Sequence, residues 1–442
     1  MDSERYDLLL KNAHVLCIDA EQTEYAPGFV AVKDGLIAAL GPMAACPPQG
    51  AREEIDCSGC ALLPGLINLH THLPMVYFRG IADDLPLTEW LEQHIWPAES
   101  RFLNPDFVYQ ATLLAVAESL KCGVTCVNDM YLFAHDVGRA CADAGMRAYV
   151  GEGVMSFATP SAESPAAGLR LTRELIAAYD GHALVTPTVC AHATYTCDEP
   201  LLQELHALAQ EHGLLFNIHL HETFDETDRT SWAVTDESPV HALKRIGVLG
   251  PRLIAAHCVW VDDHDLHHMY ESGCAVAHCP TSNLKLGSGI APVHSMTEAG
   301  VPVGVGTDGA ASNNNLNLWE EIHLAALLAK GVYKSANVVP AATALAFATS
   351  QGAQALCASH FGSLVVGKQA DMITVRLEGI HLTPVFPRPN SLAGSLVYGA
   401  QGSDVRDTIV AGRVLMRNRQ LTQLDEEALK AQAQAWVKAN FS

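Results

Sequence analysis

Two patterns of hydrophobic and polar residues follow one another along this chain of 442 residues. Up to about residue 60, apolar and polar positions alternate in short stretches separated by turn residues, which predicts short strands. From about residue 62, short continuous apolar runs alternate with longer stretches in which apolar residues recur every three or four positions. This second pattern predicts strands that alternate with helices around a parallel sheet.

Eight apolar runs lie in the second part of the chain, and their number favours a closed (β/α)8 barrel over an open, doubly wound sheet. Such a barrel needs about 250 residues plus insertions, and this part of the chain supplies about 300. The runs are ALLPGLINLH (61–70), GVTCVNDM (123–130), MRAYVGEGV (146–154), ALVTPTVCAH (183–192), LLFNIHLHE (214–222), RLIAAHCVW (252–260), CAVAHCP (274–280) and VPVGVGTD (301–308).

Polar or ionisable side chains lie at or near the end of each run. They are His70 with His72, Asn128 with Asp129, Glu152, His192, His219 with Glu222, His257, His278 and Asp308. In a barrel the carboxyl ends of all strands meet at one mouth, where active sites are built. An open sheet would spread the same side chains along an edge, so their number also favours the barrel.

Strand-like patterns return after about residue 365, in GSLVVGKQADMITVRL and DTIVAGRVLMRNRQL, before the helical tail DEEALKAQAQAWVKANF. Because this texture resembles the first 60 residues, we expect a small β-sandwich assembled from both chain ends with the barrel inserted between them. The predicted fold is α/β: a (β/α)8 TIM barrel over 61–365, with sandwich parts at 1–60 and 366–442, the latter including a terminal helix.

The net charge argues against polyanionic partners. Lys plus Arg number 27 and Asp plus Glu number 49, so the formal net charge is −22. An acidic surface repels the phosphates of nucleic acids and anionic membranes, and we expect neither as a partner. Hydrophobic residues make up 49% of the chain and charged residues 17%, which is typical of a globular protein with a sizeable core.

Cysteine usage and the N-terminal sequence suggest a cytoplasmic protein. The stretch MDSERYDLLLKNAHV lacks the basic segment and apolar core of a secretion signal, and no apolar run reaches the length of a membrane span. The 13 cysteines are odd in number and scattered, as expected of free thiols in a reducing compartment. Cys57 and Cys60 form a lone CxxC around a turn-like Ser58-Gly59, and we expect buried thiols there rather than a zinc or redox half-site.

A candidate metal site begins with His70 and His72, because residues i and i+2 of a strand face the same side. His219, His257 and Asp308 arrive at the ends of the fifth, sixth and eighth runs, so imidazole and carboxylate groups meet at the predicted mouth. Three imidazoles and one carboxylate suit one borderline divalent cation such as Zn²⁺, with Fe²⁺ or Mn²⁺ as alternatives, and leave a position for water.

Several motifs resemble the amidohydrolase superfamily, and the resemblance spans nearly the whole chain. They are PGLINLHTHL, HLHE, AAHCVW, HCPTSNLKLGSG and GTDGAASNNNLNLWEE. FRGIADDLPLTEWLEQHIWPAE (78–99) and TDGAASNN (307–314) more closely resemble the 5-methylthioadenosine/S-adenosylhomocysteine deaminases, in a branch that also contains hydrolases of guanine, pterins and triazines.

The resemblance implies a ligand set and a metal count. By resemblance, His70, His72, His219 and Asp308 are the metal ligands. Members of the superfamily that bind two metals carry a bridging modified lysine at the end of strand four. Because no lysine occurs between Lys121 and Lys244, we expect a single metal ion.

Glu222 lies three residues after His219, in an HxxE pattern that resembles the proton shuttle of deaminases in this superfamily. A carboxylic acid beside the metal can protonate N1 of a purine, which makes C6 electrophilic toward a water activated by the metal. Asp308 can accept the proton of that water, and His257 can orient it. His221 must face away from its neighbouring ligand, and we expect it in the core or behind the ligands.

Further residues are candidates for substrate binding. The resemblance implies that Glu99 accepts hydrogen bonds from ribose hydroxyls, as a carboxylate can. Trp90 and Trp96 either cover the purine and wall the pocket or only pack. His192 resembles a substrate-contacting histidine, although CAHATYT stands where the family more often has GPHAPYT. Ser312 either contacts the base or stabilises a turn.

The third βα loop bears on the 5′ substituent of the substrate. Family members that accept S-adenosylhomocysteine tend to place arginines there to pair with its carboxylate. In this chain Glu152 lies near one expected arginine position, and Arg170 lies near the other as a candidate substrate contact. Because Glu152 would repel a carboxylate, we expect 5-methylthioadenosine, 5-deoxyadenosine or adenosine to be preferred over S-adenosylhomocysteine.

The predicted function is metal-dependent hydrolysis of a C–N bond in a cyclic amidine, which converts 5-methylthioadenosine or a related adenine nucleoside to its inosine analogue and ammonia. One alternative is a deaminase or chlorohydrolase of a free heterocycle such as guanine, a pterin or a triazine. A more distant one is a non-catalytic scaffold, like the dihydropyrimidinase-related proteins that have lost metal ligands. We expect a homo-oligomer, dimer or tetramer, because such barrels commonly associate.

Overall fold

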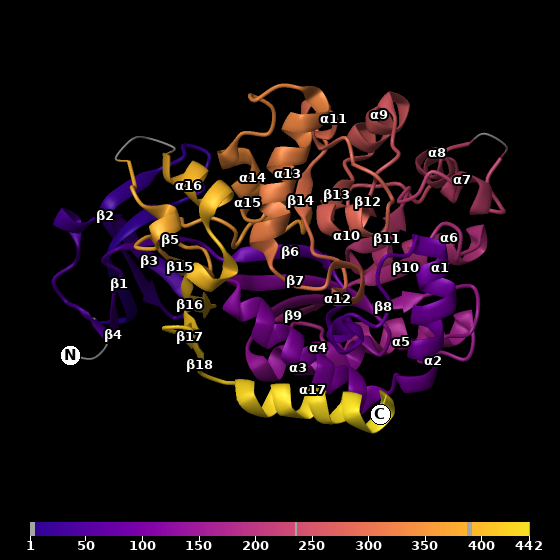
Figure 1. The fold of residues 1–442 in the computed structure, drawn as a ribbon, viewed down its shortest axis with the longest axis horizontal. Helices are drawn as coiled ribbons and strands as arrows, with labels where there is room; N and C mark the ends of the chain where they lie inside the picture. Colours follow the sequence, from indigo (N-terminus) through magenta and orange to yellow (C-terminus); the bar gives the residue numbers. More distant parts are fainter. Residues whose placement is uncertain (1–4, 235–236, 387–390, 442) are drawn as a thin grey trace.

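A barrel of parallel strands forms the largest part of the molecule in the computed structural model, which describes residues 5–234, 237–386 and 391–441 (Figure 1). Each of the eight predicted runs contributes to it, which confirms the (β/α)8 fold. The strands are β6 (Leu66–Thr71), β7 (Val124–Tyr131), β8 (Arg147–Val154), β9 (Val185–Pro187), β10 (Val189–Ala193), β11 (Phe216–Leu220), β12 (Leu253–His257), β13 (Ala275–His278) and β14 (Val303–Val305). The fourth position is shared by β9 and β10, which both pair with β8.

The barrel is closed between its first and last strands. The pairing order is β14-β13-β12-β11-β10-β8-β7-β6. The Thr307 amide donates to Asn68 Oδ1 at 3.0 Å, and Asn68 Nδ2 donates to Thr307 Oγ1 at 2.7 Å. The Asp308 amide donates to the carbonyl oxygen of His70 at 3.0 Å. Closure therefore brings His70 and Asp308 together although they lie far apart in the sequence.

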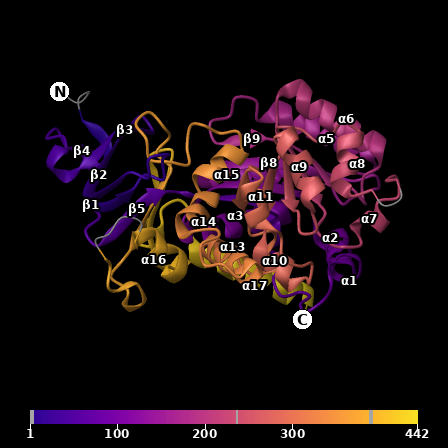
Figure 2. The ribbon, with the colours of Figure 1, turned by 90° about the horizontal axis from the view of Figure 1, so that it is seen from above.

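Helices surround the barrel, as the view from above shows (Figure 2). The longer ones are α3 (Pro105–Lys121), α4 (Ala134–Ala144), α5 (Pro165–Ala178), α6 (Glu199–His212), α9 (Asp263–Ser272), α13 (Leu318–Tyr333), α16 (Ser391–Gly399) and α17 (Glu426–Phe441). The shorter ones are α1 (Leu87–Trp90), α2 (Trp96–Phe102), α7 (Glu226–Arg229), α8 (Pro239–Arg245), α10 (Pro280–Lys285), α11 (Val293–Glu298), α12 (Ala310–Asn313), α14 (Ala341–Phe347) and α15 (Ser350–Ala355). In the described part of the chain, no helix is both long and apolar enough to cross a membrane.

Local sequence signals set the limits of several helices. Four begin at a polar side chain that accepts a hydrogen bond from the first turn, with a proline in that turn; these caps are Asn104, Ser164, Asp198 and Ser238. Three end at a glycine in the left-handed conformation: Gly145, Gly213 and Gly273. Such stops keep the connections short and hold the strand ends in register.

A second sheet contains strands from both chain ends, which confirms the predicted β domain. Its strands are β1 (Tyr6–Leu16), β2 (Glu24–Lys33), β3 (Leu36–Pro42), β4 (Ala51–Asp56), β5 (Cys60–Pro64), β15 (Met372–Arg376), β16 (Val405–Val410), β17 (Arg413–Arg417) and β18 (Gln420–Leu421). The order is β18-β17-β16-β15-β5-β1-β2-β3, with β4 paired to β1. Leu63 of β5 pairs with Ile373 of β15, so the two ends meet at the centre of this sheet.

The first predicted run, 61–70, is divided between the two sheets. Residues 61–64 belong to β5, and β6 begins at Leu66. At Gly65, which lies between them, an added Cβ would be 2.1 Å from Thr125 Oγ1. The chain therefore passes from the end sheet to the barrel at a position where only glycine fits, rather than at residue 61.

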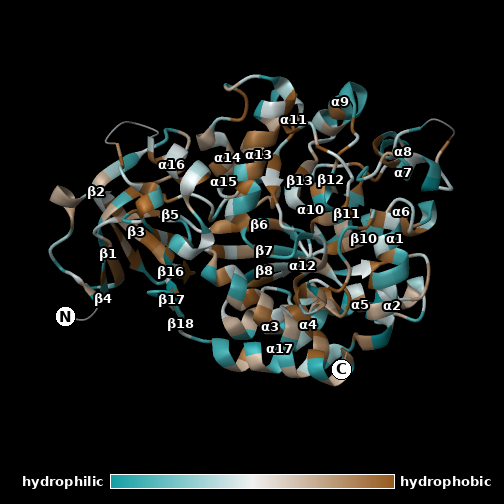
Figure 3. Cartoon of the chain, viewed as in Figure 1, coloured by the Kyte–Doolittle hydropathy of each residue, from teal (hydrophilic) through white to brown (hydrophobic). Residues whose placement is uncertain are grey.

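Helix α17 leaves the end sheet and lies along α3 of the barrel (Figures 1 and 2). Hydrophobic and hydrophilic residues alternate along it (Figure 3). The ring of its Trp436 lies 5.1 Å from Phe107, 5.2 Å from Phe102 and 5.4 Å from Tyr77, measured between centroids. This aromatic cluster connects the C-terminal helix with the segments on both sides of Glu99.

Candidate active site

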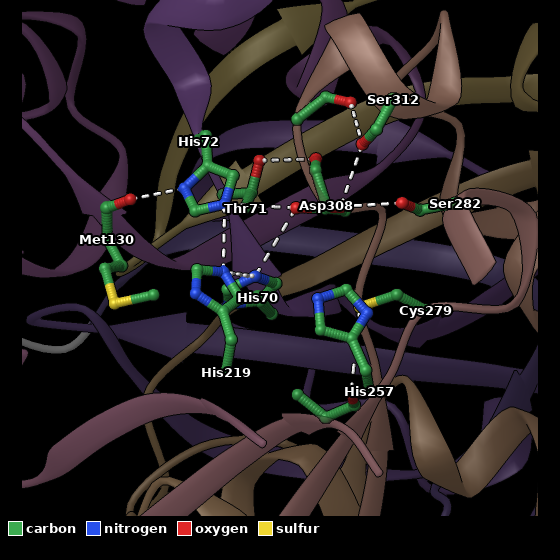
Figure 4. A network of polar contacts seen from close by, with 12 residues as sticks. His70, Thr71, His72, Met130, His219, His257, Cys279, Ser282, Asp308 and Ser312 are labelled. Atoms are coloured by element: carbon green, nitrogen blue, oxygen red, sulfur yellow. Dashed lines mark hydrogen bonds and ion pairs between the residues drawn. The ribbon is translucent and has the colours of Figure 1, made fainter. Parts of the chain in front are cut away.

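Three histidines and one aspartate converge at the mouth of the barrel (Figure 4). His219 Nε2 lies 3.2 Å from His70 Nε2 and 3.3 Å from His72 Nε2. Asp308 Oδ1 lies 3.4 Å from His70 Nε2 and 3.1 Å from His72 Nε2. A tetrahedral cation with ligands at about 2.0–2.1 Å separates neighbouring ligand atoms by roughly 3.3 Å, so the spacing fits a metal ion.

The proton positions of this group also favour a cation. His72 Nδ1 donates to the carbonyl oxygen of Met130, and His219 Nδ1 donates to that of His192 at 2.6 Å. In the neutral imidazoles both Nε2 atoms then carry lone pairs, which face each other across 3.3 Å. Asp308 Oδ1 is buried without a hydrogen-bond partner. Facing lone pairs and an unpaired carboxylate oxygen are stabilised when a cation lies among them.

The donor set indicates one such site. Within residues 5–234, 237–386 and 391–441, it is the one group of three or more His, Cys, Asp and Glu side chains with the spacing of a metal centre. Cys57 and Cys60 are both free thiols buried in the end sheet. The sequence prediction of a single metal ion agrees with this arrangement.

A cavity opens beside the metal-binding group, and the space within it and at its solvent-filled mouth amounts to about 650 Å³. Eight of the predicted site residues line it: His72, Trp96, Glu99, His192, His219, Glu222, His257 and Asp308. Most of the remaining wall is apolar and comes from Met75, Leu87, Trp90, Leu91, Met130, Leu132, Met155 and Leu286, with Tyr131 and Tyr195 adding aromatic surface. An apolar wall with a few polar groups at one end is typical of a small-molecule site.

Glu222 and His257 lie together at the metal end of the cavity. Glu222 Oε2 is 3.8 Å from His257 Nε2, and Ser288 Oγ lies 3.3 Å from Glu222 Oε1. Burial raises the pKa of Glu222 above its ordinary value, although His257 opposes the shift. The acid therefore holds its proton to a higher pH than an exposed glutamate does, as a proton donor requires.

Glu99 is held in the cavity wall by Tyr131, a residue that the sequence did not single out. The Tyr131 hydroxyl donates to Glu99 Oε1 at 2.7 Å. Burial raises the pKa of Glu99 to about 7, against the lowering effect of this hydrogen bond. Tyr131 follows directly after the second predicted run, so its place at a strand end was the signal that could have identified it.

His192 and Glu226 shape the neighbouring wall. Thr196 Oγ1 lies 2.9 Å from His192 Nδ1, and burial lowers the pKa of His192 to about 3, so this imidazole is neutral. Glu226 is buried and accepts hydrogen bonds from the amide of Glu222 at 2.8 Å and from Thr194 Oγ1 at 2.7 Å. Glu226 thus joins the segments that follow Glu222 and His192. The sequence did not single it out, because it lies among other polar residues.

Ser312 does not line the cavity in which a base would bind. Its hydroxyl donates to Asp308 Oδ2 at 2.8 Å, and the residue is buried behind the aspartate instead of lining the cavity. Its helix, α12, begins directly after Asp308 and turns the side chain back toward that carboxylate.

Arg170 and Glu152 are also outside the cavity. Arg170 lies on α5 with 62% of its side chain exposed, and its Nε is 3.6 Å from Glu174. Glu152 faces the start of α4, where its carboxylate accepts hydrogen bonds from the amides of Phe133 and Ala134. The argument that Glu152 repels a substrate carboxylate is therefore wrong, because this charge is engaged with a helix N-terminus.

Comparison with known proteins adds three findings. Residues 61–415 match the model of the amidohydrolase family. The chain is 45% identical to a 5-methylthioadenosine/S-adenosylhomocysteine deaminase of Syntrophobacter fumaroxidans, over 95% of both chains. It is 41% identical to a 5'-deoxyadenosine deaminase of Methanosarcina acetivorans, over 97% of this chain and 96% of the relative.

A solved structure resembles the fold closely. The structure of an adenosine deaminase from Xanthomonas campestris with bound zinc superposes with a TM-score of 0.95. Its sequence is 37% identical, and the match covers 99% of each chain.

Proposed function

The chain belongs to the amidohydrolase family and is a hydrolase of C–N bonds in cyclic amidines; from this premise we propose that it deaminates adenine nucleosides. The product of 5-methylthioadenosine is then 5-methylthioinosine, with release of ammonia. The observation that carries the proposal is the cavity that joins a His3Asp group, the buried acid Glu222 and the carboxylate of Glu99. Relatives and a structural neighbour named as deaminases of such nucleosides support it.

We propose Zn²⁺ as the metal, held by His70, His72, His219 and Asp308. Three imidazole nitrogens and one carboxylate oxygen suit this ion. When bound, zinc lowers the pKa of a water from about 16 to about 7, which makes hydroxide available at neutral pH. The zinc bound to the Xanthomonas campestris enzyme supports the choice over Fe²⁺ or Mn²⁺.

The chain's own residues would then move the protons. Glu222, whose pKa burial raises, delivers a proton to N1 of the purine, and C6 becomes electrophilic. His257 Nε2, 3.8 Å from Glu222, orients the attacking water. Asp308, whose carboxylate belongs to the metal-binding group, accepts a proton from that water. The amino group leaves with this proton as ammonia, and the proton that remains on the new C6 oxygen returns to Glu222, which restores the acid and leaves the C6 carbonyl.

Glu99 and His192 in the cavity wall would bind the sugar. Glu99 keeps Oε2 free while Tyr131 occupies Oε1, and its carboxylate accepts hydrogen bonds from ribose hydroxyls. His192 contributes a neutral ring nitrogen to the same wall. Trp96 lies at the edge of the cavity and makes an edge-to-face contact with Phe157 at 5.8 Å.

A second, adjoining cavity favours a small apolar 5′ substituent. It shares Trp96, Glu99, Leu132 and Met155 with the first cavity and continues along Phe157 to Pro160. Because Glu99 lies at the junction, a group on C5′ of a bound ribose extends into this space. Among the described residues that line the two cavities, no arginine or lysine is present to pair with the carboxylate of S-adenosylhomocysteine. We therefore propose that the methylthio compound, 5-deoxyadenosine and adenosine are preferred over S-adenosylhomocysteine.

The test is ammonia release by zinc-loaded enzyme from 5-methylthioadenosine, adenosine, 5-deoxyadenosine, S-adenosylhomocysteine and guanine. We expect turnover of the first three, at least tenfold lower kcat/KM for S-adenosylhomocysteine, and none for guanine. Turnover of guanine alone would move the substrate to free heterocycles and remove the role of Glu99. Equal rates with S-adenosylhomocysteine would contradict the argument from the cavity lining.

Glu222→Gln tests the proton shuttle, because the amide cannot deliver a proton to N1. We expect turnover to fall by at least a hundredfold while the protein keeps one equivalent of zinc. Asp225→Asn is the matched control, since it makes the same change at an exposed position three residues away and should leave activity unchanged. An active Glu222→Gln enzyme would exclude this shuttle.

We further propose a homo-oligomer in a reducing compartment such as the cytoplasm. All 13 cysteines are free thiols and 10 of them are buried, which supports a reducing environment. Light scattering of the purified protein tests the association, and a monomer at all concentrations would refute it.

A further inference from the structure

We propose that Ser282, Ser312 and Glu321 form a positioning unit for Asp308, which presents one carboxylate oxygen to the metal and withholds the other. None of the three lines the substrate cavity. The proposal goes beyond the deaminase activity, because it concerns metal retention and holds whichever substrate the enzyme takes.

The two oxygens of Asp308 have different surroundings. Ser282 Oγ donates to Oδ2 at 2.7 Å and Ser312 Oγ donates to the same oxygen at 2.8 Å, from two different directions (Figure 4). Oδ1 has no hydrogen-bond partner and faces the Nε2 atoms of His70 and His72. Two hydroxyl donors therefore hold Oδ2 away from the imidazoles and leave Oδ1 as the ligand atom.

Both serines lie on short helical turns that one buried carboxylate joins. Glu321 on α13 accepts a hydrogen bond from the amide of Thr281 at 3.0 Å, next to Ser282. Its other oxygen accepts from Asn313 Nδ2 at 2.7 Å, next to Ser312. Glu321 is fully buried, and these contacts account for both of its oxygens. A single side chain thus sets the separation between the two hydroxyls that hold Asp308.

This arrangement predicts that removing both serine hydroxyls costs more than the sum of removing each one. Removing one hydroxyl leaves Oδ2 with the other donor, whereas removing both leaves a buried carboxylate oxygen without any. An unsatisfied buried acceptor costs more than the loss of one of two hydrogen bonds. Freed from both donors, the carboxylate can rotate away from the geometry that the metal needs. Removing a residue that hydrogen-bonds to a metal ligand typically weakens metal binding by about 10- to 100-fold.

The experiment measures the dissociation constant for Zn²⁺ by competition with a chromophoric chelator, without substrate. We expect Ser282→Ala and Ser312→Ala each to weaken binding about tenfold, and the double variant to weaken it by more than the product of the two. Ser295→Ala is the control, because it removes a hydroxyl that bonds Tyr333 on the surface helices and should leave zinc affinity unchanged. The absence of substrate keeps this result separate from the nucleoside assignment.

Glu321→Gln tests the outer part of the unit. The amide can accept only one of the two hydrogen bonds, so we expect a similar loss of zinc affinity, together with a changed visible absorption of the Co²⁺-substituted protein. Glu320→Gln, the same change at the exposed neighbour, should change neither. Thermal unfolding of the metal-free variants identifies any that do not fold. Unchanged zinc dissociation constants in any two folded variants of the unit would overturn the proposal.

Discussion

Several side chains at the barrel mouth are aimed by an unusual backbone. His221, His257, Cys258 and Asp308 have φ angles of 50°, 74°, 48° and 61°, in the left-handed region that side chains other than glycine rarely adopt. Each such residue costs on the order of 1–3 kcal/mol, and such residues gather where function requires a particular orientation. At His257 the result is an imidazole stacked on His219 at 5.4 Å. The ends of β11, β12 and β14 are therefore built to place rings and carboxylates, at a cost to stability.

The pKa of Glu99 predicts a pH dependence of nucleoside binding. In the proposed complex the ionised carboxylate would accept hydrogen bonds from the ribose hydroxyls, and its pKa is about 7 because the group is buried. The fraction ionised falls as the pH drops through 7, so we expect KM for adenosine to rise roughly tenfold between pH 8 and pH 6.

Steady-state kinetics with two nucleosides check this prediction. The dideoxy analogue of adenosine, which lacks both the 2′ and the 3′ hydroxyl, should show no such rise in KM, and Glu99→Gln should abolish the dependence for adenosine itself. An equal pH dependence of both nucleosides in the unmodified enzyme would contradict the assignment of Glu99 to the ribose.

Residue types and strand-end positions predicted the groups that face the metal, but not the groups behind them. Because strand ends of a barrel converge, the sequence predicted that His70, His72, His219, His257 and Asp308 meet at its mouth, and the family resemblance implied which four of them are the metal ligands. Glu152 lies in β8 and Ser312 lies on α12, and neighbouring helices set the direction of each side chain. Helix α12 turns Ser312 toward Asp308, and the N-terminus of α4 donates hydrogen bonds to Glu152. Glu226 and Glu321 act on distant loops, and such contacts leave no local pattern.

Helix α17 shows how an element outside the barrel supports the site. Trp436 packs against rings from three segments, including Tyr77 from the turn after His72 and Phe102 from the helix that carries Glu99. The sequence predicts the helix but not its packing partner. The aromatic residues of α2 and α3 show no periodicity that points to a C-terminal partner.

Trp436→Ala should therefore destabilise the fold without changing the metal centre. Trp436 is half-buried, so we expect the free energy of unfolding to fall by roughly 2–3 kcal/mol, below the range for a fully buried tryptophan. Urea denaturation measures the change, and zinc content should stay at one equivalent. Val437→Ala on the exposed face of the same helix is the control. Equal losses for both variants would show that α17 contributes helix propensity rather than packing.

One boundary between elements differs from the sequence prediction for a physical reason. The run 61–70 predicts one strand because it is largely apolar. In the structure its first part is buried in the end sheet and its second part in the barrel. The turn signal Pro64-Gly65 is present, but the continuous apolar run outweighs it. Only the close approach of Thr125 to Gly65 shows why the chain must bend there.

At the scale of the whole molecule, a buried ion pair joins the barrel to the end sheet. Arg147 at the start of β8 donates from Nε and Nη2 to Asp371, at 2.6 and 3.1 Å, and both side chains are almost fully buried. Asp371 also accepts from the amide of Ala411 at 2.6 Å. The guanidinium lies over the Phe361 ring, 4.9 Å from its centroid. The two sheets thus share a polar contact with defined geometry in addition to their apolar contacts.

Breaking this pair on one side should be more damaging than removing it from both. Arg147→Met leaves the Asp371 charge buried and unpaired, and we expect a loss of roughly 3–5 kcal/mol in the free energy of unfolding. Adding Asp371→Asn removes that charge and keeps an acceptor for Ala411, so the double variant should recover part of the loss. Urea denaturation of the three proteins measures this. A double variant less stable than Arg147→Met would contradict the interpretation.

The pairing of Leu63 with Ile373 also has a consequence for how the protein is made. The edge of β5 cannot meet β15 until about 310 further residues have left the ribosome, which at roughly 5–20 residues per second takes about 15–60 s. During that time β15 is absent, so the edge of β5 that pairs with it in the folded protein has no partner. The nascent chain therefore exposes a hydrophobic strand edge throughout synthesis of the barrel, and chaperone occupancy should be highest in that interval.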